Sequence, residues 1–431
     1  MYKYFSILVL FIILNQCSLD TKTGIWNKSK IEEEKKEDVK EIFQTEKILI
    51  KEFNQNLKIR INSNYSLNPF INNLSNNTGY INFESEFKEV SKFKFKKIKN
   101  FEFINPDLLI GQDNSLVFFD DKGSILKFNQ NSELTWKVNY YDKKQKKLNP
   151  SIYFASKDQY LIAADSIANL YAIDFSNGKL LWKKYNSASF NSELKIYDDK
   201  IFLIDVDNNI RCFSLKKGSE IWSFGTQKSF LKSKRKLSLV IQNGLVIFID
   251  TFGDISALDI NSGSLVWQAQ TINEDIFESS FLLKSSRLVY DKETIFISNN
   301  QNKFFAINSR NGLIKWEQAI NSYLDPVVIK DFIIIISEEG YLVVIDKNKG
   351  NILRSTSIFD VLKNKKIYPT GFIVAKKFIY VCMSNGRLIK INIEDGKTKN
   401  IIKINGETIS KPYVLNKKMY ILRNNAIIKV E

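Results

Sequence analysis

The chain has 431 residues and a formal net charge of +16 at pH 7, with 26% charged and 13% aromatic residues. This composition is typical of a folded chain rather than a disordered one, and the length exceeds one compact globule but suits a chain built of repeats. The sequence contains no histidine, which excludes Ser–His triads, histidine acid–base catalysis and histidine zinc sites.

The positive charge has two interpretations. Lys and Arg total 63 against 47 Asp and Glu, and such an excess can attract nucleic acid, lipid headgroups or an acidic protein face. No Lys/Arg cluster, however, is combined with regularly spaced aromatic residues, as a nucleic-acid-binding platform would require. We therefore favour scattered surface lysines and expect no nucleic-acid partner.

The first 16 residues have the features of an export signal. Lys3 precedes an apolar run, Phe5–Leu14, that is too short to span a bilayer as a mature helix. Cys17 follows at the place of the lipidated cysteine of a bacterial lipoprotein, although Gln16 replaces the usual Gly or Ala before it. We predict a lipoprotein signal peptide over residues 1–16 and lipidation of Cys17, which would anchor the chain to a membrane. Plain secretion with an incidental cysteine is the alternative.

Residues 17–79 are predicted to form a lipid-anchored tether that is partly disordered. Ser18 stands where an Asp usually retains lipoproteins at the inner membrane, which favours the periplasmic side of the outer membrane. The segment from Lys22 to Asn56 is highly charged, and its sparse apolar residues indicate a short exposed helix around Glu32–Phe43. This helix is either a solvated spacer or a partner-binding element. An Asn- and Ser-rich loop follows over residues 72–79.

The stretch FKEVSKFKFKKIK, residues 87–99, alternates apolar and charged residues. This alternation predicts an exposed edge strand. A strand of this kind within residues 80–98 could complete a sheet formed by the C-terminal end of the chain, because such pairing removes an open edge.

A repeat dominates the middle of the chain. Each copy is an alternating apolar run, a polar turn, a glycine and a tryptophan four positions after the glycine: Gly178/Trp182, Gly218/Trp222, Gly263/Trp267 and Gly312/Trp316. The tryptophans are 40, 45 and 49 residues apart. A strand–turn–strand unit with a period of roughly 40–50 residues is typical of a radial repeat.

Three imperfect copies extend this pattern. Trp136 has Ser132 at the glycine place, Gly350 is followed by Arg354 at the tryptophan place, and Gly396 is followed there by Asn400. The run from Ile409 to Val430 leaves room for only about three short strands. We therefore predict an all-β protein whose residues 80–431 form an eight-bladed β-propeller with four-stranded blades, its last blade closed by an N-terminal strand.

The tryptophans are interpreted as structural residues. Each is expected on the outer strand of its blade, where the ring fills the wedge between neighbouring blades, and the glycine supplies the positive φ of the turn. A ligand-stacking role is the alternative. A structural role is also favoured for Asp205–Asn209, which resembles a fragment of a calcium loop but lacks the spaced glycine and the bidentate Glu. A hairpin turn is favoured there, and no metal site is expected.

The other two cysteines, Cys212 and Cys382, lie in apolar runs on distant repeats. Buried free thiols are favoured over a disulfide, which would need Cα atoms within about 7 Å.

Long inserts interrupt the repeat at Tyr140–Asn149, Gln227–Lys236 and Thr271–Ser286. The second is basic and the third is acidic and apolar. Interaction sites of repeat proteins often lie on such loops, although each insert can equally be a solvated loop.

The repeat resembles the pyrroloquinoline-quinone-type propeller repeat and, together with the export signal and Cys17, it is similar to the BamB family of outer-membrane assembly lipoproteins. The resemblance covers about residues 105–431. It implies a non-catalytic scaffold without a cofactor, which faces the periplasm, docks onto a BamA-like outer-membrane assembly protein and serves unfolded outer-membrane protein clients.

The resemblance also implies where the partner binds. The family's basic, Leu-rich contact loop corresponds to residues near Leu231, Ser233, Lys234 and Arg235. The family's acidic contact pair has no clear counterpart, and Glu274, Asp275 and Glu278 are displaced candidates. Two other functions remain open: a periplasmic propeller that binds another ligand such as peptidoglycan, and a quinone-dependent dehydrogenase, whose adjacent cysteines are missing here.

Overall fold

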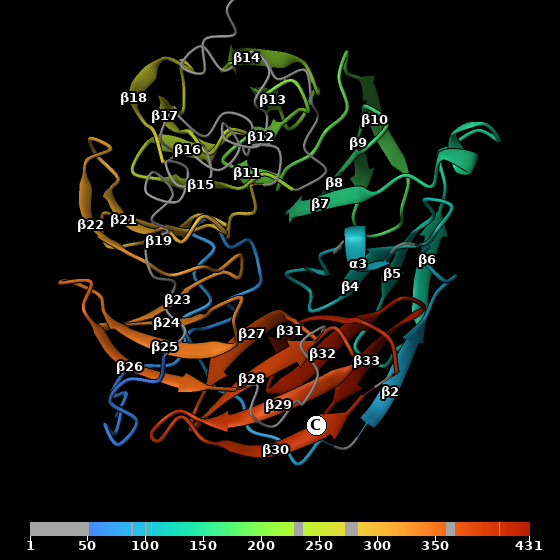
Figure 1. The fold of residues 1–431 in the computed structure, drawn as a ribbon. Helices are drawn as coiled ribbons and strands as arrows, with labels where there is room; N and C mark the ends of the chain where they lie inside the picture. Colours follow the sequence, from blue (N-terminus) through green and yellow to red (C-terminus); the bar gives the residue numbers. More distant parts are fainter. Residues whose placement is uncertain are drawn as a thin grey trace, which may run out of the picture. The chain divides into compact units, whose positions relative to one another are not determined.

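The computed structural model describes residues 51–431 except 88, 100, 105, 228–235, 272–282, 359–366 and 405, and these residues belong to the compact unit Ile48–Glu431. Within this part of the chain, eight sheets radiate from a common centre (Figure 1). Each sheet is a blade with an antiparallel meander of neighbouring strands. The chain is therefore an all-β, eight-bladed propeller.

Within each blade, successive strands are arranged in order from the centre of the propeller to its rim. The innermost strands are β3 (Leu109–Ile110), β7 (Ile152–Lys157), β11 (Lys195–Tyr197), β15 (Leu239–Gln242), β19 (Val289–Asp291), β23 (Val327–Ile329), β27 (Pro369–Ala375) and β31 (Ile409–Leu415). The second strands are β4 (Leu116–Phe119), β8 (Tyr160–Asp165), β12 (Lys200–Ile204), β16 (Leu245–Ile249), β20 (Thr294–Ser298), β24 (Phe332–Ile336), β28 (Phe378–Met383) and β32 (Lys418–Arg423).

The third strands are β5 (Ile125–Phe128), β9 (Asn169–Asp174), β13 (Asn209–Ser214), β17 (Ile255–Asp259), β21 (Phe304–Asn308), β25 (Tyr341–Asp346), β29 (Arg387–Asn392) and β33 (Ala426–Val430). The outer strands are β6 (Leu134–Val138), β10 (Leu180–Tyr185), β14 (Glu220–Gly225), β18 (Leu265–Ala269), β22 (Ile314–Gln318), β26 (Ile352–Ser357), β30 (Thr398–Lys403) and β2 (Glu89–Lys94). In the described residues, two short helices, α3 (Phe101–Ile104) and the 3-10 helix η1 (Gln145–Leu148), lie outside the sheets.

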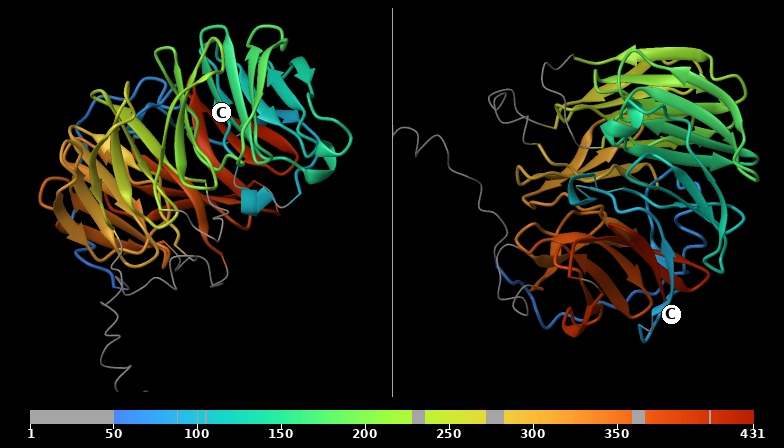
Figure 2. Two further views of the ribbon diagram at one scale, coloured as in Figure 1. Left: turned by 90° about the horizontal axis from the view of Figure 1, so that it is seen from above. Right: turned by 90° about the vertical axis from the view of Figure 1, so that its right-hand side faces the viewer.

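The outer strand of the last blade comes from the opposite end of the described chain. Strand β2 pairs antiparallel with β33, in the order β2-β33-β32-β31, and Figure 2 shows it beside the C-terminal strands. Its Phe93 is fully buried and packs edge-on against Phe128 of the first blade and against Tyr420 of the last. Strand β2 thus completes the last blade and also packs against the first blade.

The core lies between the blades rather than at one centre. On β12, Ile201 and Leu203 pack toward the preceding blade, whereas Phe202 and Ile204 pack toward the following one. Successive side chains of a strand point to opposite faces of its sheet, and both faces of each blade are covered by a neighbour. This explains why the strands are apolar on both faces despite their alternation.

Each repeat tryptophan lies on an outer strand and reaches the next blade. The indole N–H groups donate to backbone carbonyl oxygens: Trp136 to Phe175 (3.2 Å), Trp182 to Leu215 (3.1 Å), Trp222 to Ile260 (3.3 Å), Trp267 to Ser309 (2.9 Å) and Trp316 to Lys347 (3.0 Å). In every case the acceptor is three residues before the glycine of that next blade. The rings therefore join consecutive blades by both packing and hydrogen bonding.

Gly218 shows why the turn residue is a glycine. Its φ is +65°, and a Cβ atom at this position would lie 2.7 Å from the Trp182 ring. A side chain would be strained in this conformation and would also displace the indole. One glycine thus meets two independent requirements.

Residues 51–79, which the sequence analysis assigns to the tether, lie against the propeller. Phe53 forms a bridge with Ser355, Ile59 is buried, and Asn76 is only 3% exposed. Strand β1 (Tyr80–Ile81) then pairs parallel with β27 as a fifth strand. The polar residues of this stretch form hydrogen bonds to the ends of the innermost strands. No helix in the described part of the chain has the length and apolar character needed to cross a membrane.

Candidate functional site: the charged mouth of the central channel

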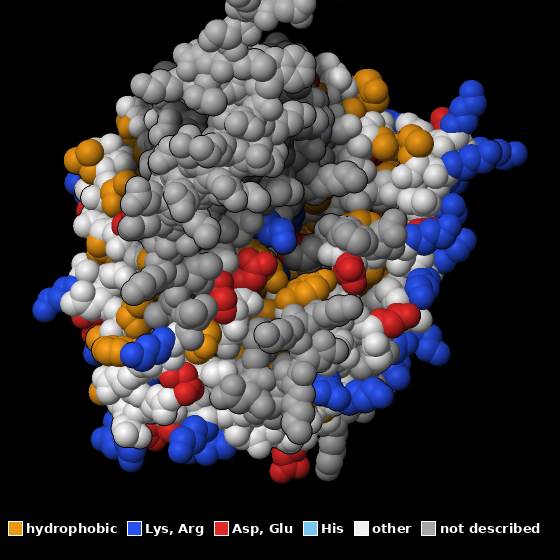
Figure 3. Space-filling model, in the orientation of Figure 1, with side chains coloured by type: hydrophobic (Ala, Val, Ile, Leu, Met, Phe, Trp, Pro, Cys, Tyr) orange, Lys and Arg blue, Asp and Glu red, His pale blue; other side chains and the backbone are white. Residues whose placement is uncertain are grey.

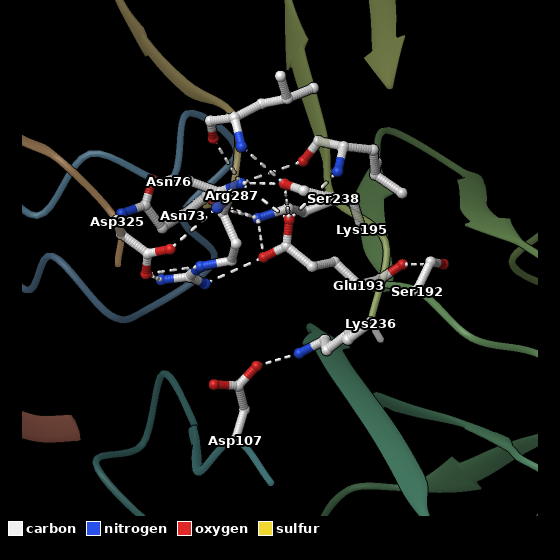
Figure 4. A network of polar contacts seen from close by, with 12 residues as sticks. Asn73, Asn76, Asp107, Ser192, Glu193, Lys195, Lys236, Ser238, Arg287 and Asp325 are labelled. Carbon is white, nitrogen blue, oxygen red and sulfur yellow. Dashed lines mark hydrogen bonds and ion pairs between the residues drawn. The ribbon is translucent and has the colours of Figure 1, made fainter. Parts of the chain in front are cut away.

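Charged side chains gather where the innermost strands begin. Asp107, Glu193, Arg287 and Asp325 each stand two residues before an innermost strand, and Lys411 lies near the start of another. Asp107, Glu193, Arg287 and Asp325 are far apart in sequence, but the radial fold brings them together around the axis (Figure 4). Lys411 belongs to the same group, because its Nζ lies 3.1 Å from Asp107. With Lys195 and Lys236 they form what we call the channel cluster: Asp107, Glu193, Lys195, Lys236, Arg287, Asp325 and Lys411.

Arg287 joins two carboxylates of this cluster. Its Nε donates to Asp325 Oδ2 at 2.8 Å, and its Nη1 donates to Glu193 Oε1 at 3.0 Å. The backbone N–H of Arg287 also donates to Asp325 Oδ1 at 3.1 Å. A guanidinium presents several donors in a fixed plane, so Arg287 fixes the ends of three blades relative to one another.

Asp107 joins two ammonium groups. Lys236 donates to its Oδ2, and Lys411 Nζ lies 3.1 Å from its Oδ1. The hydroxyl of Tyr413 donates to the same Oδ1 at 2.9 Å. Among the described residues, Asp107 is the only carboxylate within ion-pair distance of Lys236, and Lys411 has one further carboxylate, Asp325, at 3.9 Å.

The segment 72–79, which precedes the first blade in the chain, lies against part of this cluster. The side-chain amide of Asn76 donates to Glu193 Oε2 at 2.8 Å and to the carbonyl oxygen of Leu288 at 3.0 Å, and its oxygen accepts from Lys195. The backbone oxygens of Leu74 and Ser75 accept from the amides of Ile241 and Tyr290. The Asn- and Ser-rich sequence therefore satisfies polar groups at the ends of the innermost strands.

The electrostatic balance follows from burial and pairing. Burial alone would raise the pKa of Glu193, but attraction by Lys195 and Arg287 outweighs it and holds that pKa at about 2. Burial also favours a raised pKa for Asp107, but attraction by Lys236 and Lys411 outweighs burial. The pKa of Asp107 therefore lies well below its usual value. The carboxylates are thus ionised and cannot donate a proton near neutral pH.

Burial has the larger effect on two of the lysines. Burial, only partly offset by Glu193, lowers the pKa of Lys195 to about 8. Burial and repulsion by Arg287 also lower the pKa of Lys411. Among described residues the cluster has four cations and three carboxylates, so positive charge exceeds negative charge by one.

A cavity of about 120 Å³ lies beside the cluster. Its polar part is lined by the cations Lys195, Lys236, Arg287 and Lys411, by the carboxylates Asp107 and Glu193 and by neutral polar residues such as Asn76, while Phe70, Ile104, Leu109, Phe119, Ile152 and Phe154 line its apolar part. Figure 3 shows basic, acidic and hydrophobic side chains around the hollow at the centre of this face.

The residues predicted to bind a partner lie outside the described residues. This applies to Leu231, Ser233, Lys234 and Arg235, to Glu274, Asp275 and Glu278, and to the predicted lipidation site Cys17. In sequence, the first group is followed directly by Lys236 of the channel cluster. Both groups also precede innermost strands, β15 and β19.

Two other sequence interpretations can be compared with the structure. Asp205 directly follows β12, and its Oδ1 accepts hydrogen bonds from the backbone N–H groups of Asp207 and Asn209 in the hairpin to β13. No group of three potential metal ligands occurs in the described part of the chain. Cys212 and Cys382 are buried free thiols.

The channel cluster was not predicted from the sequence. Its signal is a charged residue two positions before several innermost strands, as in Asp107 before LLI, Arg287 before LVY and Asp325 before PVVI. These residues belong to unrelated local contexts, and only the register of the blades shows that they share one level of the channel.

Comparison with known proteins places this architecture in a family. The family described as outer membrane protein assembly factor BamB matches residues 121–356, more than half of the chain. The BamB of Shewanella oneidensis is 19% identical over 267 residues, which cover 50% of this chain and 67% of that protein. Across the curated relatives that it matches, the chain spans about a third to two thirds of their length.

Solved structures show the same fold. The crystal structure of BamB from Moraxella catarrhalis aligns with a TM-score of 0.64 at 16% identity and covers 80% of this chain and 97% of that one. Quinohemoprotein alcohol dehydrogenase from Comamonas testosteroni aligns with a TM-score of 0.61 at 9% identity, covering 81% and 78%. These likenesses show the fold alone, whereas the family match over residues 121–356 identifies the family: the chain belongs to the BamB family of outer membrane protein assembly factors.

Proposed function

We propose that this chain is a non-catalytic scaffold subunit of the outer-membrane β-barrel assembly machinery, which docks a BamA-like protein and aids the insertion of barrel proteins. The family match over residues 121–356 carries this proposal. It includes a periplasmic location and attachment to the outer membrane through lipidated Cys17, since the export signal and the cysteine precede the propeller in the chain.

The chemistry of the channel cluster supports a scaffold more than an enzyme. Its carboxylates Asp107, Glu193 and Asp325 are held in ion pairs that keep each pKa low, so none is poised as a general acid or base near neutral pH. The chain has no histidine. A rigid set of blades that carries loops is, in contrast, well suited to holding a partner.

The inserts that contain Lys234 and Arg235 and Glu274, Asp275 and Glu278 are the proposed docking loops. They precede β15 and β19, so both connect an outer strand to the innermost strand of the next blade. Loops of this kind emerge from one face of a propeller. A partner domain that spans neighbouring blades can therefore contact both.

The test is co-purification with BamA from native membranes. The double variant Lys234→Glu/Arg235→Glu should reduce recovery of BamA by at least about tenfold, which corresponds to about 1.4 kcal/mol. The matched control is Lys143→Glu/Lys144→Glu, which makes the same change in charge at two exposed residues of another insert. Thermal unfolding of all three proteins checks that the propeller is intact.

Unchanged recovery of BamA with the Lys234/Arg235 variant would remove these residues from the interface. Recovery of peptidoglycan instead of BamA by the wild-type protein would favour a cell-wall-binding propeller and would contradict the proposed scaffold role.

A further inference from the structure

The cavity beside the channel cluster combines a charged wall, in which four cations face the carboxylates Asp107 and Glu193, with an apolar one. Lys236, three residues before β15, and Lys411, on β31, reach the same carboxylate, Asp107, from different blades. The side chains of Phe70, Leu109 and Phe154 face the same cavity. A cavity with this division is suited to a molecule that has one anionic and one apolar end.

The ammonium groups retain hydrogen-bonding capacity. Each lysine carries three N–H donors, yet among the described residues Lys236 has Asp107 as its acceptor and Lys411 has Asp107 and, at a longer distance, Asp325. Lys236 Nζ also lies 5.7 Å from the centre of the Tyr153 ring. One carboxylate therefore serves two ammonium groups at the cavity wall.

The carboxylates of the cluster do not neutralise it. Glu193 and Asp325 are both paired with Arg287. Glu193 also lies 3.8 Å from Lys195 Nζ and accepts a hydrogen bond from Asn76. The four cations against three carboxylates leave one positive charge in excess. Because Lys236 and Lys411 are only about one fifth exposed and share one carboxylate, the excess positive charge would attract a second carboxylate beside them.

We propose that this cavity binds a small organic carboxylate, with the carboxylate between Lys236 and Lys411 and the apolar body against Phe70, Leu109 and Phe154. The site adjoins one proposed docking loop, because Lys236 is the last residue of the insert 227–236, but it does not rest on the binding of BamA. The same chemistry can be supplied by a free organic acid or by the terminal carboxylate of a peptide that ends in an apolar residue.

The size of the cavity limits the ligand. Its volume of about 120 Å³ is slightly below that of an engineered protein cavity of about 150 Å³ that holds benzene. An acid whose apolar body is no larger than a benzene ring is therefore a suitable probe. Benzoate, with about nine non-hydrogen atoms, places only its ring in the apolar part of the cavity, and ligands of this size bind with dissociation constants from about micromolar to millimolar.

The experiment is calorimetric titration of the full chain with benzoate and with benzamide, its neutral counterpart of the same shape. Benzoate should bind saturably and at least about tenfold more tightly than benzamide. Lys411→Gln and Lys236→Gln should each weaken benzoate binding at least about tenfold. Lys183→Gln, at an exposed position of β10, should leave it unchanged, and unfolding temperatures verify that each variant is folded.

Two further arms separate the possible sources. A short peptide with a C-terminal phenylalanine is tested as the free acid and as the amide; stronger binding of the acid than of benzoate identifies a peptide terminus as the natural source, and weaker binding identifies a free acid. Absence of saturable benzoate binding in the millimolar range overturns the proposal. Equal binding of benzoate and benzamide, or binding by Lys236→Gln and Lys411→Gln at wild-type strength, overturns it as well.

Discussion

Arg354 Nη2 donates a hydrogen bond of 2.8 Å to the carbonyl oxygen of Ile393. Ile393 is three residues before Gly396, the place where the five preceding blade junctions receive a tryptophan indole. Arg354 is fully buried, and its Nη1 also donates to the carbonyl oxygens of Leu57 and Glu394. The guanidinium thus replaces the indole at this junction and additionally holds the segment 51–59.

The first prediction concerns this replacement. Arg354→Ala should lower the free energy of unfolding by about 3–5 kcal/mol, because it leaves a cavity and removes the donors to one buried and two partly buried carbonyl groups. It should also expose the segment 51–59 to trypsin, which cleaves after Lys51 and Lys58. Urea denaturation followed by tryptophan fluorescence and limited proteolysis measure the two effects.

The control for Arg354 is Arg387→Ala, since Arg387 is exposed on β29 and its loss should change stability by no more than about 0.5 kcal/mol. Equal stability of the two variants would show that Arg354 does not join the blades.

The second prediction separates the two requirements on Gly218. Gly218 and Gly244 both have positive φ, +65° and +75°, but only Gly218 faces an indole; nothing lies within 4 Å of a Cβ at Gly244. Gly244→Ala should therefore cost about 1–2 kcal/mol through backbone strain alone, and Gly218→Ala should cost a further 1–3 kcal/mol or so through the clash with Trp182.

A double-mutant cycle measures that clash directly. In a Trp182→Ala background the additional cost of Gly218→Ala should disappear, because the neighbour that it meets has been removed. If the additional cost persists without the indole, the glycine is required for another reason.

The blades could be predicted from the sequence because each repeat carries its own local signal. Gly263 and Trp267 mark the third and outer strands of one blade by spacing alone, and the alternation around Phe93 indicates an edge strand. No local signal of this kind marks the contact of the segment before residue 80 with the propeller. Asn76 is polar and lies in an Asn-rich run, which has the sequence of a loop, and only the structure shows its partners Glu193 and Lys195.

The channel cluster illustrates a second limit. Arg287 and Asp325 are 38 residues apart and pair only because the blades share one register about the axis. A repeat pattern gives the order of the blades but not which ends of innermost strands carry complementary charges. The proposed docking residues, such as Lys234 and Glu274, depend on the family resemblance and stay predictions.

The third prediction concerns the covering segment 72–79. Asn76→Leu preserves approximate size but removes the donors to Glu193 and the acceptor of Lys195. Leaving charged groups without these partners should cost at least about 3 kcal/mol. The amides of Ile241 and Tyr290, which donate to the backbone of Leu74 and Ser75, should then exchange with solvent faster.

Hydrogen exchange measured by NMR or mass spectrometry tests this, with Asn62→Leu at an exposed position as the control. Unchanged exchange at Ile241 and Tyr290 in Asn76→Leu would contradict the role of Asn76 in holding the segment.

The fourth prediction uses the hairpin carboxylates. Burial, with repulsion by Asp254 in addition, raises the pKa of Asp250 to about 6, whereas the unfolded value is about 3.9. The folded state therefore binds the proton more tightly, so that stability increases as the pH falls from above 6 to below 4. At pH 7 the ionised carboxylate costs up to about 3 kcal/mol, at about 1.4 kcal/mol per pKa unit.

Asp250→Asn should accordingly stabilise the protein at pH 7 and give little gain at pH 4, as measured by the difference in unfolding free energy from wild type across this range. Asparagine is compatible with the turn, because Asn299 occupies the corresponding place before β21 and accepts the backbone N–H groups of Gln301 and Lys303. Asp205→Asn provides the contrast: Asp205 accepts a hydrogen bond of 2.8 Å from Arg211 Nε, so its neutralisation should destabilise the protein at pH 7. Stabilisation by both substitutions, or by neither, would show that the partner of each carboxylate does not decide the sign.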